Sequence, residues 1–102
     1  MSVILCMALL MQAVPEPVVT GRATWFHAPD HTAAAGPALR KALGRGWRGT
    51  TVRVCHDGRC ERLRLQDWCG CPNGRVIDLS HRVFRRFEPL WRGVMRVRVV
   101  LP

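Results

Sequence analysis

Apolar and charged residues alternate along two stretches near the middle of the chain, residues 50–55 and 60–65. A period of two puts the apolar residues on one face of an extended strand, so each stretch predicts a strand with one buried face. The HDGR segment between them contains an Asp-Gly pair, which is a strong signal for a hairpin turn. The two strands are therefore expected to form an antiparallel hairpin.

The same kind of pattern predicts three further strands, at residues 21–26, 74–79 and 93–101. The segment between residues 27 and 47 is rich in proline and glycine and is expected to be a loop, with a short Ala-rich piece at 32–35. Two strand openings, RGTTVRV at 48–54 and RGVMRVRV at 92–99, resemble each other and indicate a faint two-fold repeat. Short strands with one helix, and without a regular strand–helix alternation, predict a small, mostly antiparallel barrel.

One helix is predicted after the strand at 74–79. Ser80 is a favoured N-cap residue, and the segment HRVFRRFEPL that follows it has helical periodicity up to Pro89. The residues on its apolar side are expected to pack into the barrel, and these are Leu79, Val83, Phe84 and Phe87. The opposite side is expected to face solvent and carries Arg82, Arg85 and Arg86.

Charge narrows the range of partners. The 102 residues suffice for one domain, and 16 basic against 7 acidic residues give a net charge of +9. All but one of the basic residues are arginines. Such a surface favours anionic partners such as a cell-wall polymer, with a plain compositional bias toward arginine as the alternative. Because the sequence has no recognisable nucleic-acid motif, nucleic acid is not expected as a partner.

The first thirteen residues, MSVILCMALLMQA, are almost wholly apolar. This run is shorter than the roughly 20 residues of a membrane-spanning helix, so no stable membrane span is expected. It resembles the hydrophobic region of a signal peptide and predicts export, with an apolar arm that docks on a partner as the alternative. The Pro-rich VPEPVV after it is expected to be a linker. The predicted organisation is a leader and linker over residues 1–20 and a barrel domain over residues 21–102.

The cysteines fit an exported protein. Besides Cys6 in the leader there are four, Cys55, Cys60, Cys69 and Cys71, an even number that is typical of disulfides. Cys55 and Cys60 flank the predicted turn, so they are expected to face each other and to form a disulfide easily. A Cys69–Cys71 bond would close a very small, strained ring. Disulfides from these two residues to Cys55 and Cys60, zinc binding and free thiols are therefore the alternatives. Zinc sites usually have C-x2-C spacing, so no metal and no cofactor are expected.

The landmarks occur in a distinctive order: GRATWF, TAAAGPALR, the TVRV strand and its hairpin, LRLQDWCGCPNGRVIDLS, the helix and RGVMRVRV. This order resembles the double-psi β-barrel domain of the rare lipoprotein A (RlpA-like) family over about residues 21–100, and most of all its short cysteine-containing versions from actinobacteria and their phages. The resemblance implies an all-β fold, a six-stranded double-psi β-barrel with one short helix. It also implies secretion or a place in a phage virion, peptidoglycan as the partner and, in active members, lytic cleavage of glycan strands.

Lytic cleavage requires one carboxyl, which protonates the leaving oxygen and then accepts the proton of the attacking C6 hydroxyl. Such a group needs a partly desolvated, apolar setting. Asp67 matches the aspartate of the family's Val-x-Asp motif and is the expected general acid/base, with capping of the next loop as the alternative. It is expected on a groove wall, partly exposed, with an aromatic ring, Trp68 or Trp25, and at least one arginine nearby. The expected substrate-binding residues are Trp68, Trp25, Asp30 and Arg75.

Two other residues are expected to be structural. Asp78 lies just before the predicted helix, where a carboxylate can bind backbone amides, with a catalytic role as the alternative. Ser80 is the expected cap of that helix.

The sequence departs from the pattern of active family members at two points. Those members carry a Glu in the loop after the first strand and a His at the end of a Thr-Ala-Ala-His segment. Here the loop holds no Glu, and Ala35 stands where the His would align. Asp30, His27 and His31 could substitute for them. A non-catalytic wall-binding or virion structural module is therefore the alternative function, and the sequence leaves open whether the chain is an enzyme.

Overall fold

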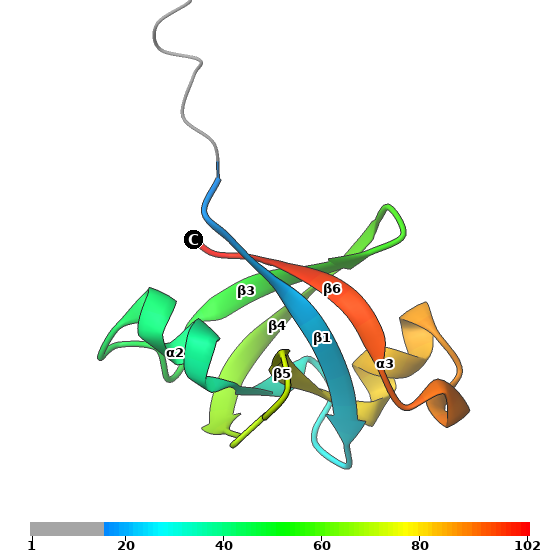
Figure 1. The fold of residues 1–102 in the computed structure, drawn as a ribbon. Helices are drawn as coiled ribbons and strands as arrows, with labels where there is room; N and C mark the ends of the chain where they lie inside the picture. The colour runs from blue at the N-terminus through cyan, green and yellow to red at the C-terminus, as the bar shows by residue number, and fades with distance from the viewer. Residues whose placement is uncertain (1–15) are drawn as a thin grey trace, which may run out of the picture.

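The computed structural model describes residues 16–102, so the expected leader at 1–13 lies outside the described residues. In chain order the elements are β1 (Val18–Phe26), β2 (Thr32–Ala35), α2 (Pro37–Leu43), β3 (Thr51–His56), β4 (Arg59–Trp68), β5 (Arg75–Ser80), α3 (His81–Phe87), the 3-10 helix η1 (Leu90–Arg92) and β6 (Met95–Val100). The strands close into a barrel in the order β1-β5-β2-β4-β3-β6 (Figure 1). The predicted six-stranded barrel is confirmed.

Most neighbouring strands run antiparallel, as predicted. Only the pairs β1–β5 and β2–β4 are parallel. In the closed order β1, β2 and β3 take positions equivalent to those of β4, β5 and β6, so the barrel has two similar halves. The two similar sequence segments at 48–54 and 92–99 overlap the equivalent strands β3 and β6, which pair with each other. The faint repeat in the sequence therefore corresponds to a repeat in the fold.

The hairpin between β3 and β4 forms as predicted. Cys55 and Cys60 are register partners and are joined by a disulfide, with their Cα atoms 4.0 Å apart. Asp57 and Gly58 both have positive φ, at 49° and 79°. Positive φ at both central residues is what a two-residue type I′ turn requires, and an Asp-Gly pair adopts it readily.

The helix α3 covers one end of the barrel with its apolar side. Val83, Phe84 and Phe87 are buried in the core, whereas Arg82 and Arg85 are exposed. The side chain of Ser80 accepts a hydrogen bond from the backbone N–H of Arg82 and caps the helix. The predicted helix, its cap and its buried face are confirmed.

The prediction of a loop at 27–47 is wrong, because this segment contains a strand and a second helix. The Ala-rich piece is β2, whose four residues are all buried between β4 and β5. Helix α2 begins with Pro37. Proline fits the first turn because the backbone N–H that it lacks would have no partner within the helix there. The helix buries Leu39. No helix within residues 16–102 has the length and apolar character that a membrane crossing needs.

Strand β1 begins earlier than the strand predicted at 21–26. Val18 and Val19 pair with Val100 and Val99 of β6, so the segment expected to be a linker partly joins the sheet.

Both parallel pairs contain a β-bulge, which decides which way the site residues face. Between β2 and β4 the partners step from Ala33↔Leu65 to Ala34↔Asp67, so β4 advances by two residues while β2 advances by one. Leu65 and Ala33 both belong to the core, and side chains alternate between faces along a strand. The extra residue, Gln66, therefore turns Asp67 to the outer face together with Ala34.

Candidate functional site

Four polar or small residues form a row across neighbouring strands on the outer face of the barrel. Thr24 on β1 pairs with Asp78 on β5, Asp78 pairs with Ala34 on β2, and Ala34 pairs with Asp67 on β4. We call these four residues the carboxylate row. Since adjacent strands lie about 4.8 Å apart, the backbones of the two aspartates are separated by roughly 9–10 Å. The small side chain of Ala34 lies between them and is almost fully buried.

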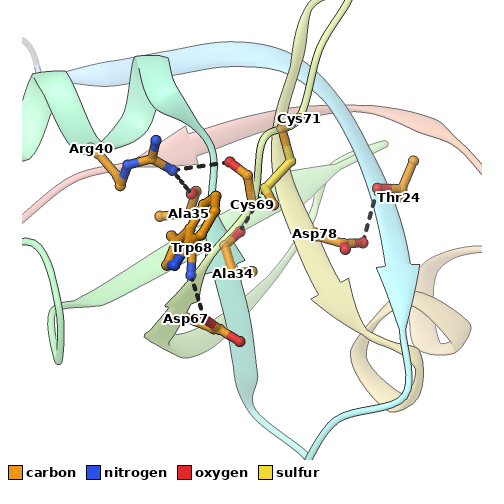
Figure 2. The surroundings of a disulfide bond; sticks show 9 residues. All are labelled: Thr24, Ala34, Ala35, Arg40, Asp67, Trp68, Cys69, Cys71 and Asp78. Atoms are coloured by element: carbon orange, nitrogen blue, oxygen red, sulfur yellow. Dashed lines mark hydrogen bonds between the residues drawn. A yellow bond between two sulfur atoms is a disulfide. The ribbon is translucent and has the colours of Figure 1, made fainter.

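Asp78 is held on the side of β1. Its carboxylate accepts a hydrogen bond of 2.9 Å from the hydroxyl of Thr24, and it is half-buried (Figure 2). Asp78 is expected from the sequence to bind backbone amides at the start of α3. In the structure the side chain of Ser80 makes the capping contact there instead. Asp78 instead ties β5 to β1, which fixes the orientation of its carboxylate within the row.

Asp67 is exposed and borders a hollow. One carboxylate oxygen accepts the backbone N–H of Trp68 at 2.8 Å, and among the described residues the other oxygen has no hydrogen-bond partner. The hollow has a volume of about 330 Å³ and is lined by Phe26, Ala28, Pro29, Thr32, Ala33, Arg48, Gln66 and Asp67. The aromatic ring that lines the hollow is that of Phe26, and neither Trp68 nor Trp25 lines it; Arg48 is the arginine. The role of Asp67 as an acid stays a prediction.

Trp68 follows Asp67 and presents its indole ring to solvent. The side chain is 59% exposed, and the guanidinium of Arg40 lies 5.7 Å from the ring centroid. Arg40 also donates hydrogen bonds to the carbonyls of Ala35 and Cys69, at 2.6 and 3.0 Å (Figure 2). The arginine is therefore fixed to the backbone on either side of the tryptophan. Because the Arg40 guanidinium is held over the ring, it restricts the rotation of the indole.

A second disulfide closes the loop after Trp68. Cys69 and Cys71 are bonded to each other, and the Cys69 N–H donates to Ala35 of β2 at 3.0 Å (Figure 2). Cys55 and Cys60 are also bonded to each other, so all four cysteines are in disulfides. These four cysteines therefore do not bind zinc, and neither Cys69 nor Cys71 pairs with a hairpin cysteine. Gly36 allows this loop to pack closely, because a Cβ there would lie 2.7 Å from the carbonyl oxygen of Val76 and 3.1 Å from Cys71. The disulfide thus anchors the chain directly after the site.

Two of the expected substrate-binding residues lie away from Asp67. Trp25 is half-buried, packs against the core and donates its indole N–H to the carbonyl of Leu90 at 2.8 Å. Arg75 lies at the other end of β5, in register with Arg22. Its buried Nε has no hydrogen-bond partner among the residues that the structure describes. Trp25 and Trp68 each follow a residue of the carboxylate row, but Trp25 packs against the core, whereas Trp68 is exposed.

Asp30 is engaged by an arginine of α3. Both terminal guanidinium nitrogens of Arg86 reach its carboxylate, at 2.8 and 2.5 Å, so Arg86 is exposed as predicted but also forms an ion pair. This hydrogen-bonded ion pair holds the pKa of Asp30 well below its usual value of 3.8, at about 2, and it outweighs the opposing effect of burial. Asp30 therefore joins the loop after β1 to α3, and it is not available as a proton donor near neutral pH.

The pairing of Asp30 predicts how stability depends on pH. Because the carboxyl has a lower pKa in the folded chain than in the unfolded chain, it stabilises the fold above pH 3.8, and this contribution disappears as the pH falls to about 2. Melting curves of the wild type and of Asp30→Asn should differ near neutral pH and converge over that acidic range. A difference in melting temperature that stays the same down to about pH 2 would contradict the assignment.

The histidines of the loop lie outside the hollow beside Asp67. His27 lies with its ring centroid 5.5 Å from Trp25 and 4.7 Å from His81, and His31 lies 3.7 Å from the already paired Asp30. Ala35 belongs to the core. None of the three lines the hollow beside Asp67.

Sequence reasoning missed Thr24, Ala34 and Arg48. Thr24 and Ala34 belong to the GRATWF and TAAAGPALR segments, but only the strand register brings them beside the aspartates. Arg48 directly follows the expected loop and donates a hydrogen bond to the carbonyl of Gln66, next to Asp67.

Comparison with known proteins identifies two groups of similar chains. No protein-family model matches the sequence. A papain inhibitor of Streptomyces mobaraensis is 40% identical over 48 residues, which are 47% of this chain and 34% of the inhibitor, so the match spans about a third of that protein.

Solved structures extend the likeness to nearly the whole barrel. The Streptomyces papain inhibitor superimposes with a TM-score of 0.64 and 24% identity, over 86% of this chain and 97% of that one. The expansin of Clavibacter michiganensis superimposes with a TM-score of 0.69 both as the apo form and as a mutant in complex with cellohexaose, at 21% and 20% identity. These matches cover 84% of this chain and 50% of the expansin. Both relatives are double-psi β-barrels, and so is this chain.

Proposed function

We propose that this chain is an extracellular barrel that binds cell-wall glycan strands, peptidoglycan in particular, through the carboxylate row and Trp68. The observation that carries the proposal is the row itself, in which Asp67 and Asp78 flank the small Ala34 beside an exposed indole. Carboxylates accept hydrogen bonds from sugar hydroxyls, and a fixed aromatic face covers the apolar face of a sugar ring.

Three further observations support this class of partner. Two disulfides within one small domain fit an oxidising, extracellular compartment, as expected for a leader over residues 1–20 and a domain over 21–102. The expansin with the same fold was crystallised with cellohexaose. The order of motifs that resembles RlpA-like proteins favours peptidoglycan over cellulose.

Net charge adds a second, less specific attraction. The charge of +9 draws the chain toward anionic wall polymers, and such attraction weakens as salt is added. Binding to glycan itself should depend less on salt, since it rests on hydrogen bonds and stacking.

Co-sedimentation with purified sacculi tests the proposal. We expect the protein to pellet with sacculi from which the anionic polymers have been stripped, and to do so in both low and high salt. Crystalline cellulose serves as a parallel substrate, and binding to cellulose alone would assign a different polysaccharide. Binding that disappears when the anionic polymers are removed would contradict recognition of the glycan.

Cleavage is the more demanding form of this proposal, with Asp67 as general acid/base. In its favour, Asp67 borders a hollow together with Arg48, and one oxygen of its carboxylate is not held by the described residues. Because Asp67 is exposed, the bound glycan itself would have to exclude water from it. Mass spectrometry of digested sacculi would then detect anhydro-muropeptides with the wild type and none with Asp67→Asn. Absence of such products with both proteins would leave a binding module.

Inhibition of a papain-like protease is a second candidate function. It rests on the 40% identity with the papain inhibitor over 48 residues. Titrating papain with the purified chain tests it directly, since an inhibitor should abolish peptide hydrolysis near equimolar concentration. Full papain activity at a large excess of the chain would exclude this function for papain.

A further inference from the structure

His56, Asp57 and Glu88 come together where the β3–β4 hairpin meets the end of α3. Among the described residues they form the single group of three metal-ligating side chains whose ligand atoms all lie within 4.8 Å of one another. His56 Nε2 is 3.5 Å from Asp57 Oδ2 and 3.8 Å from Glu88 Oε2. In Figure 1 the hairpin tip and α3 lie on the side of the barrel away from α2, whereas β4 ends on the side of α2. The cluster is therefore separate from the carboxylate row.

The imidazole of His56 is oriented as a metal ligand requires. Its Nδ1 lies 2.7 Å from the backbone carbonyl of Arg96, and because a carbonyl only accepts, Nδ1 carries the proton. In the neutral ring the lone pair is then on Nε2, which faces the two carboxylates. Histidines that bind metal ions almost always donate their other N–H to a carbonyl or a carboxylate in this way. The ring is also packed edge-on against Phe87, with 15% of the side chain exposed.

The two sides of the cluster are joined independently of any ion. Arg59, the register partner of His56 in the hairpin, donates hydrogen bonds to the carbonyls of Arg86 and Phe87, at 2.9 and 3.4 Å. These carbonyls directly precede Glu88. One oxygen of Glu88 is bound by Arg92 at 3.5 Å, while the other points to His56. The Cys55–Cys60 disulfide joins the next pair of residues in the same hairpin, close to the turn.

We propose that His56, Asp57 and Glu88 form a zinc-binding site that clasps the hairpin to α3. Ligands held tetrahedrally around Zn²⁺ at about 2.0–2.2 Å lie roughly 3.3–3.6 Å from one another, close to the observed 3.5 and 3.8 Å. The ligand atoms of Asp57 and Glu88 lie within 4.8 Å of each other, and because Asp57 is largely exposed at the turn, its side chain can move closer to Glu88. Three protein ligands leave a fourth position for water or for an external ligand. A nitrogen ligand favours zinc over Mg²⁺ and Ca²⁺, which prefer oxygen.

The alternative to a zinc site is a protonated His56 that forms ion pairs with the two carboxylates. Calorimetric titration of the full chain with zinc chloride distinguishes zinc binding from ion pairing alone. We expect one zinc site that is lost in His56→Ala and weakened in Glu88→Gln. Since loss of a mere outer-shell partner typically weakens metal binding by about 10–100-fold, loss of the histidine should weaken it by more than roughly 100-fold. His31→Ala is the matched control, because His31 also lies beside an aspartate, but Arg86 already occupies that aspartate.

Thermal denaturation gives an independent readout. Zinc should raise the melting temperature of the wild type and of His31→Ala but not that of His56→Ala, whereas magnesium and calcium should raise none of them. If His56→Ala does not fold, the near-isosteric Glu88→Gln decides by the same two measurements. Zinc that neither binds nor stabilises the wild type, or that binds His56→Ala equally well, would overturn the proposal in favour of ion pairing alone.

Discussion

Replacing Phe84 with alanine is expected to lower the free energy of unfolding by about 3–5 kcal/mol. Phe84 is fully buried on the inner side of α3, and it is among the largest side chains without any exposed surface. Truncation removes apolar surface from the core and leaves a cavity, since the strands around it cannot close in on the missing ring. Domains of this size have a total stability of roughly 5–15 kcal/mol, so the variant should be close to unfolding.

Chemical denaturation and thermal melting measure this effect. For a domain of this size each kcal/mol corresponds to roughly 4–8 °C, so the melting temperature should fall by at least about 12 °C. Arg85→Ala is the matched control, because Arg85 is the next residue on the same helix and is exposed. An unchanged melting temperature for Phe84→Ala would show that the barrel does not depend on the packing of α3.

Replacing Trp68 with alanine is expected to weaken binding to stripped sacculi by about 30-fold. Exposed aromatic residues that anchor a ligand typically contribute about 2 kcal/mol or more, and each 1.4 kcal/mol is about tenfold in affinity. Trp68 is suited to this role because Arg40 and the Cys69–Cys71 loop hold the segment around it in place. The arginine beside the ring limits its motion, which reduces the side-chain entropy that is lost on binding.

The chain offers a closely matched control in Trp91→Ala. Trp91 is 78% exposed and also has an arginine, Arg92, within 5.0 Å of its ring centroid, but it lies on η1 and has no part in the carboxylate row. Sedimentation assays should therefore show a loss for Trp68→Ala and none for Trp91→Ala, with equal melting temperatures. An equal loss for the two variants would indicate non-specific adsorption through exposed indoles.

The proposed zinc clasp and the proposed glycan site can be tested without mutual interference. His56 and Glu88 lie at the hairpin and α3, whereas Asp67 and Trp68 end β4 beside the Cys69–Cys71 loop. Trp68→Ala should leave the response to zinc unchanged. Failure of one proposal therefore does not decide the other.

Local patterns in the sequence were sufficient for several parts of this protein. The alternation on both sides of Asp57-Gly58 predicted the hairpin and its disulfide, because turn geometry and strand period act between near neighbours. Ser80 and the apolar spacing after it predicted α3 and its buried face for the same reason. The motif order, which resembles that of a known barrel family, predicted the six-stranded closed sheet.

Only the tertiary structure decided which residues share the site. Asp67 faces outward because a bulge adds one residue to β4 opposite β2, and nothing in the LRLQDW segment alone shows where a partner strand will skip a residue. Thr24, Ala34 and Asp78 come beside it through pairing of strands that are far apart in the sequence. The contacts of Asp30 with Arg86 and of His56 with Glu88 likewise join distant segments. Propensity and periodicity describe neighbours along the chain, whereas these contacts depend on strand register and on how α3 closes the barrel.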